Sequence, residues 1–180
     1  LVAIVGVSQL GTLAVYPKVA AKLNRRQLYS LGTVLVVLGY IVFFFAEVSI
    51  VLIALGAILV FIGQALIQTL MLMFLADTVE YGQWKLGKRN ESITFSIQPF
   101  INKIGGAIST GVVSITLMVS GVKVEGGTAE TIDAAGKLAI KGAMFILPLV
   151  FILLGYVIYL KKYKIDEEFY NRILNDLEAK

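Results

Sequence analysis

Residues 49–75 read SIVLIALGAILVFIGQALIQTLMLMFL, a run without a single charged residue. A helix needs about 20 apolar residues to cross roughly 30 Å of hydrocarbon at about 1.5 Å per residue. This run is therefore predicted to form a membrane-spanning helix, long enough to tilt or to extend past the bilayer.

Four further apolar runs flank this one. The whole chain is 58% hydrophobic and 16% charged, whereas about 25% of the residues of a soluble domain are charged. We predict an all-α integral membrane protein with a helical bundle over residues 1–160 and an amphipathic tail over 161–180. The five predicted spans are about 1–20, 28–46, 49–75, 92–119 and 138–160.

The basic residues predict the orientation of these spans. The segments after spans one, three and five, with the tail, hold 12 of the 16 Lys and Arg residues. Segments rich in Lys and Arg stay in the cytoplasm. We therefore expect a multi-pass protein of the cell membrane with a cytoplasmic C-terminus, and the net charge of +4 calls for no nucleic-acid partner.

The start of the chain and its missing residue types set further limits. Leu1 opens an apolar run with no basic segment before it, so we expect no signal peptide and a longer protein whose N-terminal part is missing. The chain has no Cys and no His. Thiolate and imidazole metal sites, nucleophiles and proton relays are thereby excluded within it, and no cofactor or metal is expected.

Lys103 is a charged residue at a position where charge is costly, inside a predicted membrane span. It falls near the middle of the span 92–119, where an ammonium group costs about 2.5–3.5 kcal/mol on insertion scales. A functional interpretation places Lys103 beside an aqueous pathway. The alternative is a structural ion pair, but none of the five spans holds a carboxylate at this depth.

Uncharged polar residues predict where a substrate would pass. At about 100° per residue, Thr110 shares the face of Lys103, and Gln98 and Asn102 form a neighbouring stripe. Amide groups can hydrogen-bond to sugar hydroxyls, but they can equally join two helices. The candidate pathway residues are Gln64, Gln68, Gln98, Asn102 and Thr110.

The segment 77–91 is dense in mixed charge and is predicted to be a cytoplasmic loop. Its acids can pair with bases of the same segment or with those after the first span. One interpretation is a cytoplasmic gate that forms in one transport state and breaks in another; the other is a solvated loop, whose exposed pairs contribute about 0–1 kcal/mol. The candidate gate residues are Asp77, Glu80, Lys85, Arg89 and Glu91.

Two motifs carry a resemblance to a known family. Residues 76–93 read ADTVEYGQWKLGKRNESI and residues 96–107 read SIQPFINKIGGA. Together they resemble the glycoside–pentoside–hexuronide:cation symporters, which include the melibiose and lactose permeases and have the twelve-helix major-facilitator fold. In weaker form the resemblance covers essentially the whole chain, which looks like helices 8–12 of such a transporter.

The resemblance implies roles for several of these residues. Lys103 matches the lysine associated with cation coupling, Gln98 lies in the part of that helix beside the sugar, and the charges of 77–91 match those of a cytoplasmic loop. The coupling ion would be Na⁺, Li⁺ or H⁺, with ligands mainly in the missing N-terminal helical bundle. Gln68 and Pro99 depart from a melibiose-type pocket, which has an aromatic side chain and a hydroxyl at these places.

The function expected from the resemblance is sugar:cation symport by alternating access, with the sugar, the cation, the bilayer and the N-terminal bundle as partners. A membrane-embedded enzyme acting on lipid or glycan is an alternative, although the absence of His and Cys counts against it. A non-transporting sensor of the same fold is another.

The tail has the pattern of a short amphipathic helix. Asp166, Glu167 and Glu168 suit a helix N-terminus, and apolar residues follow at helical spacing. The tail is therefore predicted to lie against the cytoplasmic face or to lead into a further domain; the alternative is a frayed polar tail, because short helices are only weakly stable. In the last span, Pro148 predicts a kink.

Overall fold

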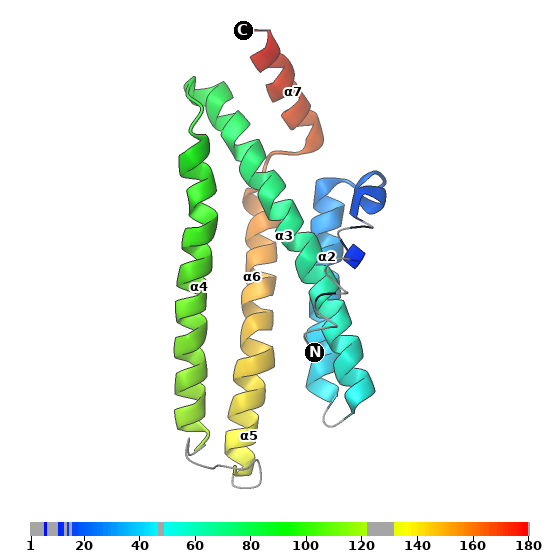
Figure 1. Ribbon diagram of the computed structural model, residues 1–180, viewed down its shortest axis with the longest axis vertical. Coiled ribbons are helices and arrows are strands. Elements are labelled where there is room, and N and C mark those ends of the chain that lie inside the picture. Colours follow the sequence, from blue (N-terminus) through cyan, green and yellow to red (C-terminus); the bar gives the residue numbers. More distant parts are fainter. Residues whose placement is uncertain are drawn as a thin grey trace. The chain divides into compact units, whose positions relative to one another are not determined.

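The computed structural model describes residues 6, 11–12, 14, 16–46, 49–121 and 132–179. These residues are almost entirely helical, and the described part of the chain contains no strand (Figure 1). The all-α fold is therefore confirmed. The elements are α2 (Arg25–Phe45), α3 (Ile50–Leu86), α4 (Glu91–Val119), α5 (Ala134–Lys141), the π-helix η2 (Gly142–Ile146), α6 (Leu147–Lys162) and α7 (Glu167–Glu178).

Among the described residues, four helical stretches are long and apolar enough to cross a membrane. They are Arg25–Phe45, Ile50–Leu86, Glu91–Val119 and Ala134–Lys162. Each overlaps one of the predicted spans from the second to the fifth. The first predicted span, 1–20, lies largely outside the described residues.

The chain divides into two compact units. The first consists of Leu1–Ser96 with Gly155–Lys180, and the second of Ile97–Leu154. Thus α4 begins in the first unit and continues in the second, whereas α6 begins in the second unit and ends in the first.

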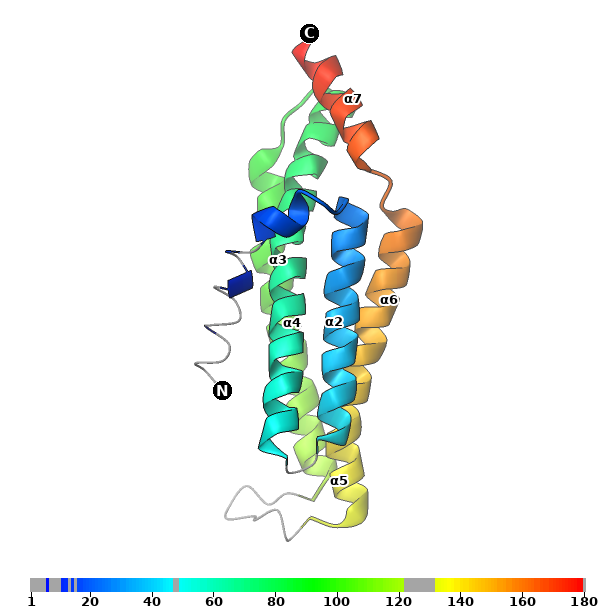
Figure 2. The ribbon, with the colours of Figure 1, turned by 90° about the vertical axis from the view of Figure 1, so that its right-hand side faces the viewer.

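Within the first unit, α2 and α3 pack side by side through glycines (Figure 2). A Cβ atom added at Gly63 would lie 2.5 Å from the carbonyl oxygen of Gly32 and 2.7 Å from Cγ2 of Val36. A Cβ atom added at Gly39 would lie 2.6 Å from Cγ2 of Val60. These distances leave no room for a side chain, so glycine lets the two backbones approach closely, as small residues do between membrane helices.

A small apolar core lies beside this interface. Leu28 of α2 and Leu66 and Leu70 of α3 are buried against one another. The segment before α2 joins the core through Tyr16, whose hydroxyl donates a hydrogen bond to Sδ of Met73 at 3.0 Å. The described end of the first predicted span is thereby attached to α3.

The third span is longer than the apolar run predicts, because α3 continues to Leu86. It ends where Gly87 adopts a left-handed conformation with φ of 68° and its N–H bonds to the carbonyl of Gln83, a common form of helix C-cap. The segment 77–91, expected to be a loop, is thus helical as far as Leu86, because no proline interrupts the helix before Gly87.

A separate short helix, α7, closes the first unit. The Asp166 side chain caps it by accepting a hydrogen bond from the N–H of Phe169 at 2.8 Å. Ile173 is fully buried, and α7 packs against α3. The helix predicted in the tail is therefore present.

The second unit contains most of α4, together with α5, η2 and the start of α6. In η2 the N–H of Leu147 bonds to the carbonyl of Gly142, one residue further back than in an α-helix. Pro148 follows directly and has no N–H to donate. The irregularity predicted at Pro148 thus takes the form of a widened turn before it.

Candidate functional site

Arg25 and Asp77 form a buried ion pair at the charged end of the first unit. Arg25 is the first residue of α2 and Asp77 lies late in α3; Nη1 of Arg25 contacts Oδ2 of Asp77. Asp77 is only 2% exposed. A buried carboxylate is tolerated when it is paired and hydrogen-bonded, and the Tyr163 hydroxyl supplies a second donor to Oδ2 at 3.2 Å.

Arg25 is also held by α7. Its backbone N–H donates to Oε1 of Glu167 at 2.9 Å. Its guanidinium carbon lies 4.4 Å from the centre of the Tyr170 ring, within the range of a cation–π contact. Arg25 therefore joins α2 to the late part of α3 and to α7, although Arg25 and Glu167 lie 142 residues apart in the sequence. We call Arg25, Asp77, Tyr163, Tyr170 and Glu167 the ion-pair network.

Both tyrosines of this network stay protonated near neutral pH. Burial, followed by the negative charge of Asp77 and the hydrogen bond to it, raises the pKa of the Tyr163 hydroxyl well above its ordinary value. Burial, followed by a hydrogen bond to Glu80, raises the pKa of Tyr170 to about 12. The two hydroxyls can therefore act as steady hydrogen-bond donors to these carboxylates.

A group of aromatic rings packs next to the ion-pair network. The Tyr159 ring centre lies 4.3 Å from that of Tyr29 and 5.2 Å from that of Tyr163. The Phe74 ring centre lies 4.6 Å from that of Tyr163. The rings join α2, α3 and the end of α6 and exclude water from one side of the buried pair, which strengthens its electrostatic interaction.

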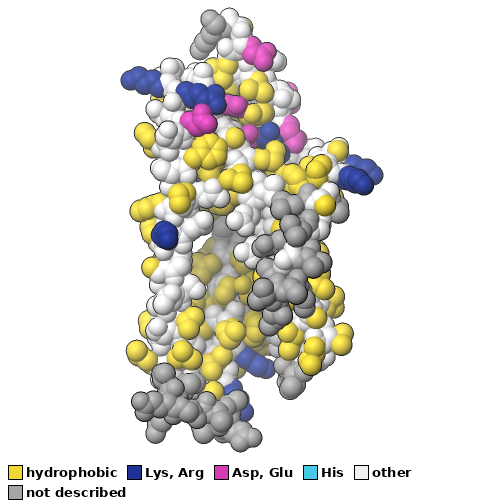
Figure 3. Space-filling model, viewed as in Figure 1, with side chains coloured by type: hydrophobic (Ala, Val, Ile, Leu, Met, Phe, Trp, Pro, Cys, Tyr) yellow, Lys and Arg dark blue, Asp and Glu magenta, His cyan; other side chains and the backbone are white. Residues whose placement is uncertain are grey.

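Three of the other predicted gate residues, Lys85, Arg89 and Glu91, make their side-chain contacts outside the ion-pair network. Arg89 pairs with Glu91 at 3.1 Å, and both side chains are about half exposed. Lys85 donates to the hydroxyl of Tyr81 at 3.2 Å. Glu80 approaches the network through Tyr170, and its buried Oε2 has no hydrogen-bond partner among the described residues. Figure 3 shows acidic side chains gathered around α7 and the end of α3.

The structure places Lys103 on an open helix surface. No residue of α4 is buried, and Lys103 itself is exposed. No hydrogen bond or ion pair joins it to another described residue. Thr110 and Asn102 are likewise exposed, and Gln98 is half-buried, so the polar face predicted for this span is accessible.

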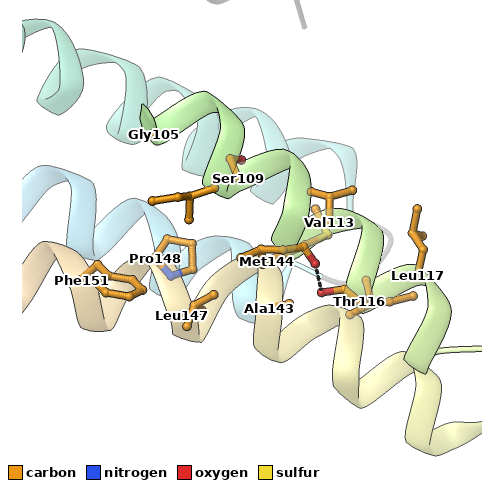
Figure 4. A pocket seen from close by; sticks show the side chains of 13 residues that line it. Gly105, Ser109, Val113, Thr116, Leu117, Ala143, Met144, Leu147, Pro148 and Phe151 are labelled. Carbon is orange, nitrogen blue, oxygen red and sulfur yellow. Dashed lines mark hydrogen bonds between the residues drawn. The ribbon is translucent and has the colours of Figure 1, made fainter. Parts of the chain in front are cut away.

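A cavity of about 460 Å³ lies within the second unit (Figure 4). On the α4 side it is lined by residues that include Gly105 and Ser109, and on the other side by residues that include Met144 and Phe151. The Thr116 hydroxyl donates its proton to the carbonyl of Val112 at 2.7 Å, so it has no further proton to donate to a ligand in the cavity. The lining is mainly apolar, and it includes none of the predicted pathway residues.

Gln64 and Gln68 belong to α3 and are both exposed. At about 100° per residue, Gln64 lies about 100° and Gln68 about 140° around the helix from Gly63, which packs on α2. Neither amide is therefore used to hold α2 and α3 together.

Comparison with known proteins decides the family. Residues 1–167 match the family model described as MFS/sugar transport protein. The chain belongs to this family. Its membership confirms the resemblance to the sugar:cation symporters drawn from the motifs at 76–93 and 96–107.

Several relatives in the family are similar over most of the chain. The lactose permease of Lactobacillus delbrueckii subsp. bulgaricus is 40% identical over 91% of the chain and 26% of that permease. The raffinose carrier protein of Pediococcus pentosaceus is 36% identical over 94% of the chain and 26% of that carrier. The glucuronide carrier protein homolog of Escherichia coli is 32% identical over 83% of the chain and 33% of its own length.

These relatives are transporters and not enzymes, in agreement with the prediction that the chain has no catalytic role. The chain spans about a quarter of the length of the first two. Its family and the four apolar helices in the described part of the chain make it a multi-pass membrane protein.

Proposed function

We propose that this chain forms part of a secondary active transporter that moves a sugar together with Na⁺, Li⁺ or H⁺ by alternating access. The observation that carries the proposal is the match of residues 1–167 to a sugar-transport family that includes lactose and raffinose carriers. Such transporters bind their substrates near the middle of the membrane, between helical bundles. Here an N-terminal bundle outside this chain would supply the other wall.

The ion-pair network acts as a cytoplasmic gate in this proposal. Lys and Arg are enriched at the ends of the helices that carry the network. This enrichment favours a cytoplasmic position for the network and for the C-terminus, in the plasma membrane. A buried ion pair is weak support for stability, but it suits an element that is paired in one state and opened in another. Glu80, Lys85, Arg89 and Glu91 would form the more exposed part of the gate.

Lys103 couples the cation to the sugar in this proposal. An ammonium group on an open polar face near mid-membrane would lie near carboxylates supplied by the N-terminal bundle, and a bound cation would replace it. Cation and sugar occupancy would then be linked by a reciprocal coupling energy. The sugar would pass along the residues predicted from the sequence: Gln64, Gln68, Gln98, Asn102 and Thr110.

A chimeric transporter tests this proposal. In the chimera, this chain replaces the matching segment of the Lactobacillus delbrueckii lactose permease, and lactose uptake is measured in cells. We expect uphill, cation-dependent accumulation. In the Lys103→Gln variant, accumulation should fall to the level of equilibration while downhill entry remains, because the charge that couples the two ligands is gone.

The matched control is Lys137→Gln, which removes an exposed lysine of α5 and should leave accumulation unchanged. Full cation-dependent accumulation by the Lys103→Gln chimera would refute the coupling role. Sugar binding without flux by the chimera itself would instead favour the non-transporting sensor.

A further inference from the structure

A second cavity, of about 340 Å³, lies in the first unit beside the ion-pair network. It is formed where α2 begins, α6 ends and α7 begins. Unlike the cavity in the second unit, it has both acidic and basic residues in its lining. The lining residues are Asn24, Arg25, Arg26, Tyr159, Leu160, Tyr163, Lys164, Ile165, Asp166 and Glu167.

The acidic groups of the lining are engaged with helix N-termini. Asp166 accepts a hydrogen bond from the N–H of Phe169 at 2.8 Å. Glu167 accepts one from the N–H of Arg25 at 2.9 Å. Both carboxylates thus cap helices, where negative charge is favourable.

The basic groups of the lining are less fully used. The guanidinium of Arg25 is paired with Asp77. Arg26 and Lys164 are exposed, and neither has an ion-pair partner among the described residues. They come from two different helix ends and border the same cavity, which is an arrangement that suits an anionic group held by two cations.

The cavity lies beside the end of the apolar sequence of α6, where this helix is expected to leave the membrane. The apolar sequence of α6 ends at Lys161 and Lys162, and the rings of Tyr159 and Tyr163 flank this point. Aromatic and basic residues concentrate at the membrane–water boundary. Leu160 and Ile165 add apolar lining to the cavity, and Ile158 is 61% exposed one turn before Lys162.

We propose that this cavity binds the headgroup of an anionic phospholipid. The lipid phosphate lies between Arg26 and Lys164, and the acyl chains follow the exposed apolar surface of α6. Basic pockets at the ends of membrane helices recognise lipid headgroups in this way. The apolar lining at the membrane boundary favours a lipid over free phosphate, which would leave that surface exposed to water.

Lipid binding by the purified chain in detergent micelles tests the proposal. Native mass spectrometry measures the binding of phosphatidylglycerol and of phosphatidylcholine, and inorganic phosphate is added as a competitor. We expect phosphatidylglycerol to bind in preference to phosphatidylcholine, with no competition by millimolar phosphate. The double variant Arg26→Gln/Lys164→Gln should weaken phosphatidylglycerol binding by roughly tenfold or more, since each basic residue contributes about 1 kcal/mol near a lipid surface.

The matched control is Lys161→Gln/Lys162→Gln, which removes the same charge at the same end of α6 but outside the cavity lining. This control should lose clearly less binding than Arg26→Gln/Lys164→Gln. Equal losses in the two variants would overturn the proposal, because they would show diffuse attraction to basic residues. Displacement of the lipid by phosphate alone would overturn it as well, because the site would then recognise phosphate without a lipid.

Discussion

The α2–α3 pair and α4 use the same small residue in opposite ways. In α2 and α3, a Cβ atom at Gly39 or Gly63 would collide with the neighbouring helix. In α4, a Cβ atom at Gly105 or Gly106 would meet no described atom within 4 Å. Both regions are apolar enough to cross a membrane, so hydropathy alone does not distinguish them.

The difference shows which helix surfaces pack against another helix of this chain and which remain exposed. α2 and α3 bury surface against each other through close backbone packing. The ion-pair network attaches the start of α2 and the late part of α3 to α7. α4 has no buried residue, and Asn102, Lys103 and Thr110 on it are exposed. Stability should therefore depend on α2 and α3, and transport on α4.

The largest expected effect on stability comes from breaking the buried ion pair. Asp77→Ala should destabilise the first unit by about 3–5 kcal/mol, because it leaves the Arg25 charge partly buried without its partner. Glu91→Ala removes the partner of Arg89 in an exposed pair and should cost at most about 1 kcal/mol. Unfolding in a detergent titration, followed by circular dichroism, measures both; equal losses would show that burial does not distinguish the two pairs.

The next effect sharpens the contrast between the glycines. Gly63→Ala should destabilise the α2–α3 pair by about 1–3 kcal/mol, because the added methyl group overlaps the Gly32 carbonyl and Val36. Gly106→Ala makes the same chemical change in open space and should be neutral or slightly stabilising, because alanine favours helix. Thermal unfolding of the two variants compares them directly. If Gly106→Ala were as harmful as Gly63→Ala, α4 would have a close neighbour after all.

The smallest effect concerns the attachment of α7 to α3. Nε1 of Trp84 donates to Oδ2 of Asp176 at 2.9 Å. Trp84→Phe should keep the aromatic contact with Phe169 and lose this bond, at a cost of about 1 kcal/mol. Hydrogen exchange of the α7 amides should rise by about fivefold.

Tyr81→Phe is the control for this prediction. It also removes one polar atom from a ring that contacts Phe169, but its hydroxyl bonds to Lys85 within α3. Exchange in α7 should therefore not change. A rise equal to that of Trp84→Phe would show that the Trp84–Asp176 bond does not anchor the helix.

Much of the fold could be predicted because it depends on local composition. The uncharged run 49–75 predicts the greater part of α3, and the pattern of acids and apolar residues after Ile165 predicts α7. The end of α3 at Leu86 was not predicted, because the charges after Asp77 suggested a loop. The absence of proline up to the left-handed Gly87 was the signal that could have corrected this.

The site was predicted only in part. Asp77 was expected to pair with a base of its own segment or with one after the first span. In the structure it pairs with Arg25, which lies after the first span. Tyr163 and Tyr170 were missed, because they meet Asp77 and Arg25 only through tertiary packing across long stretches of sequence. The roles predicted for Lys103 and for the pathway residues remain predictions.

The widened turn at Gly142–Ile146 has a consequence for tolerated changes of length. A π-turn accommodates one residue more than the α-helix around it needs. Deleting one residue within this turn would convert it to ordinary α-helix and leave Leu147–Lys162 in phase with α5. The same deletion later in α6 would rotate every following side chain by about 100°. Natural insertions and deletions in this last span should therefore be confined to the few residues before Pro148.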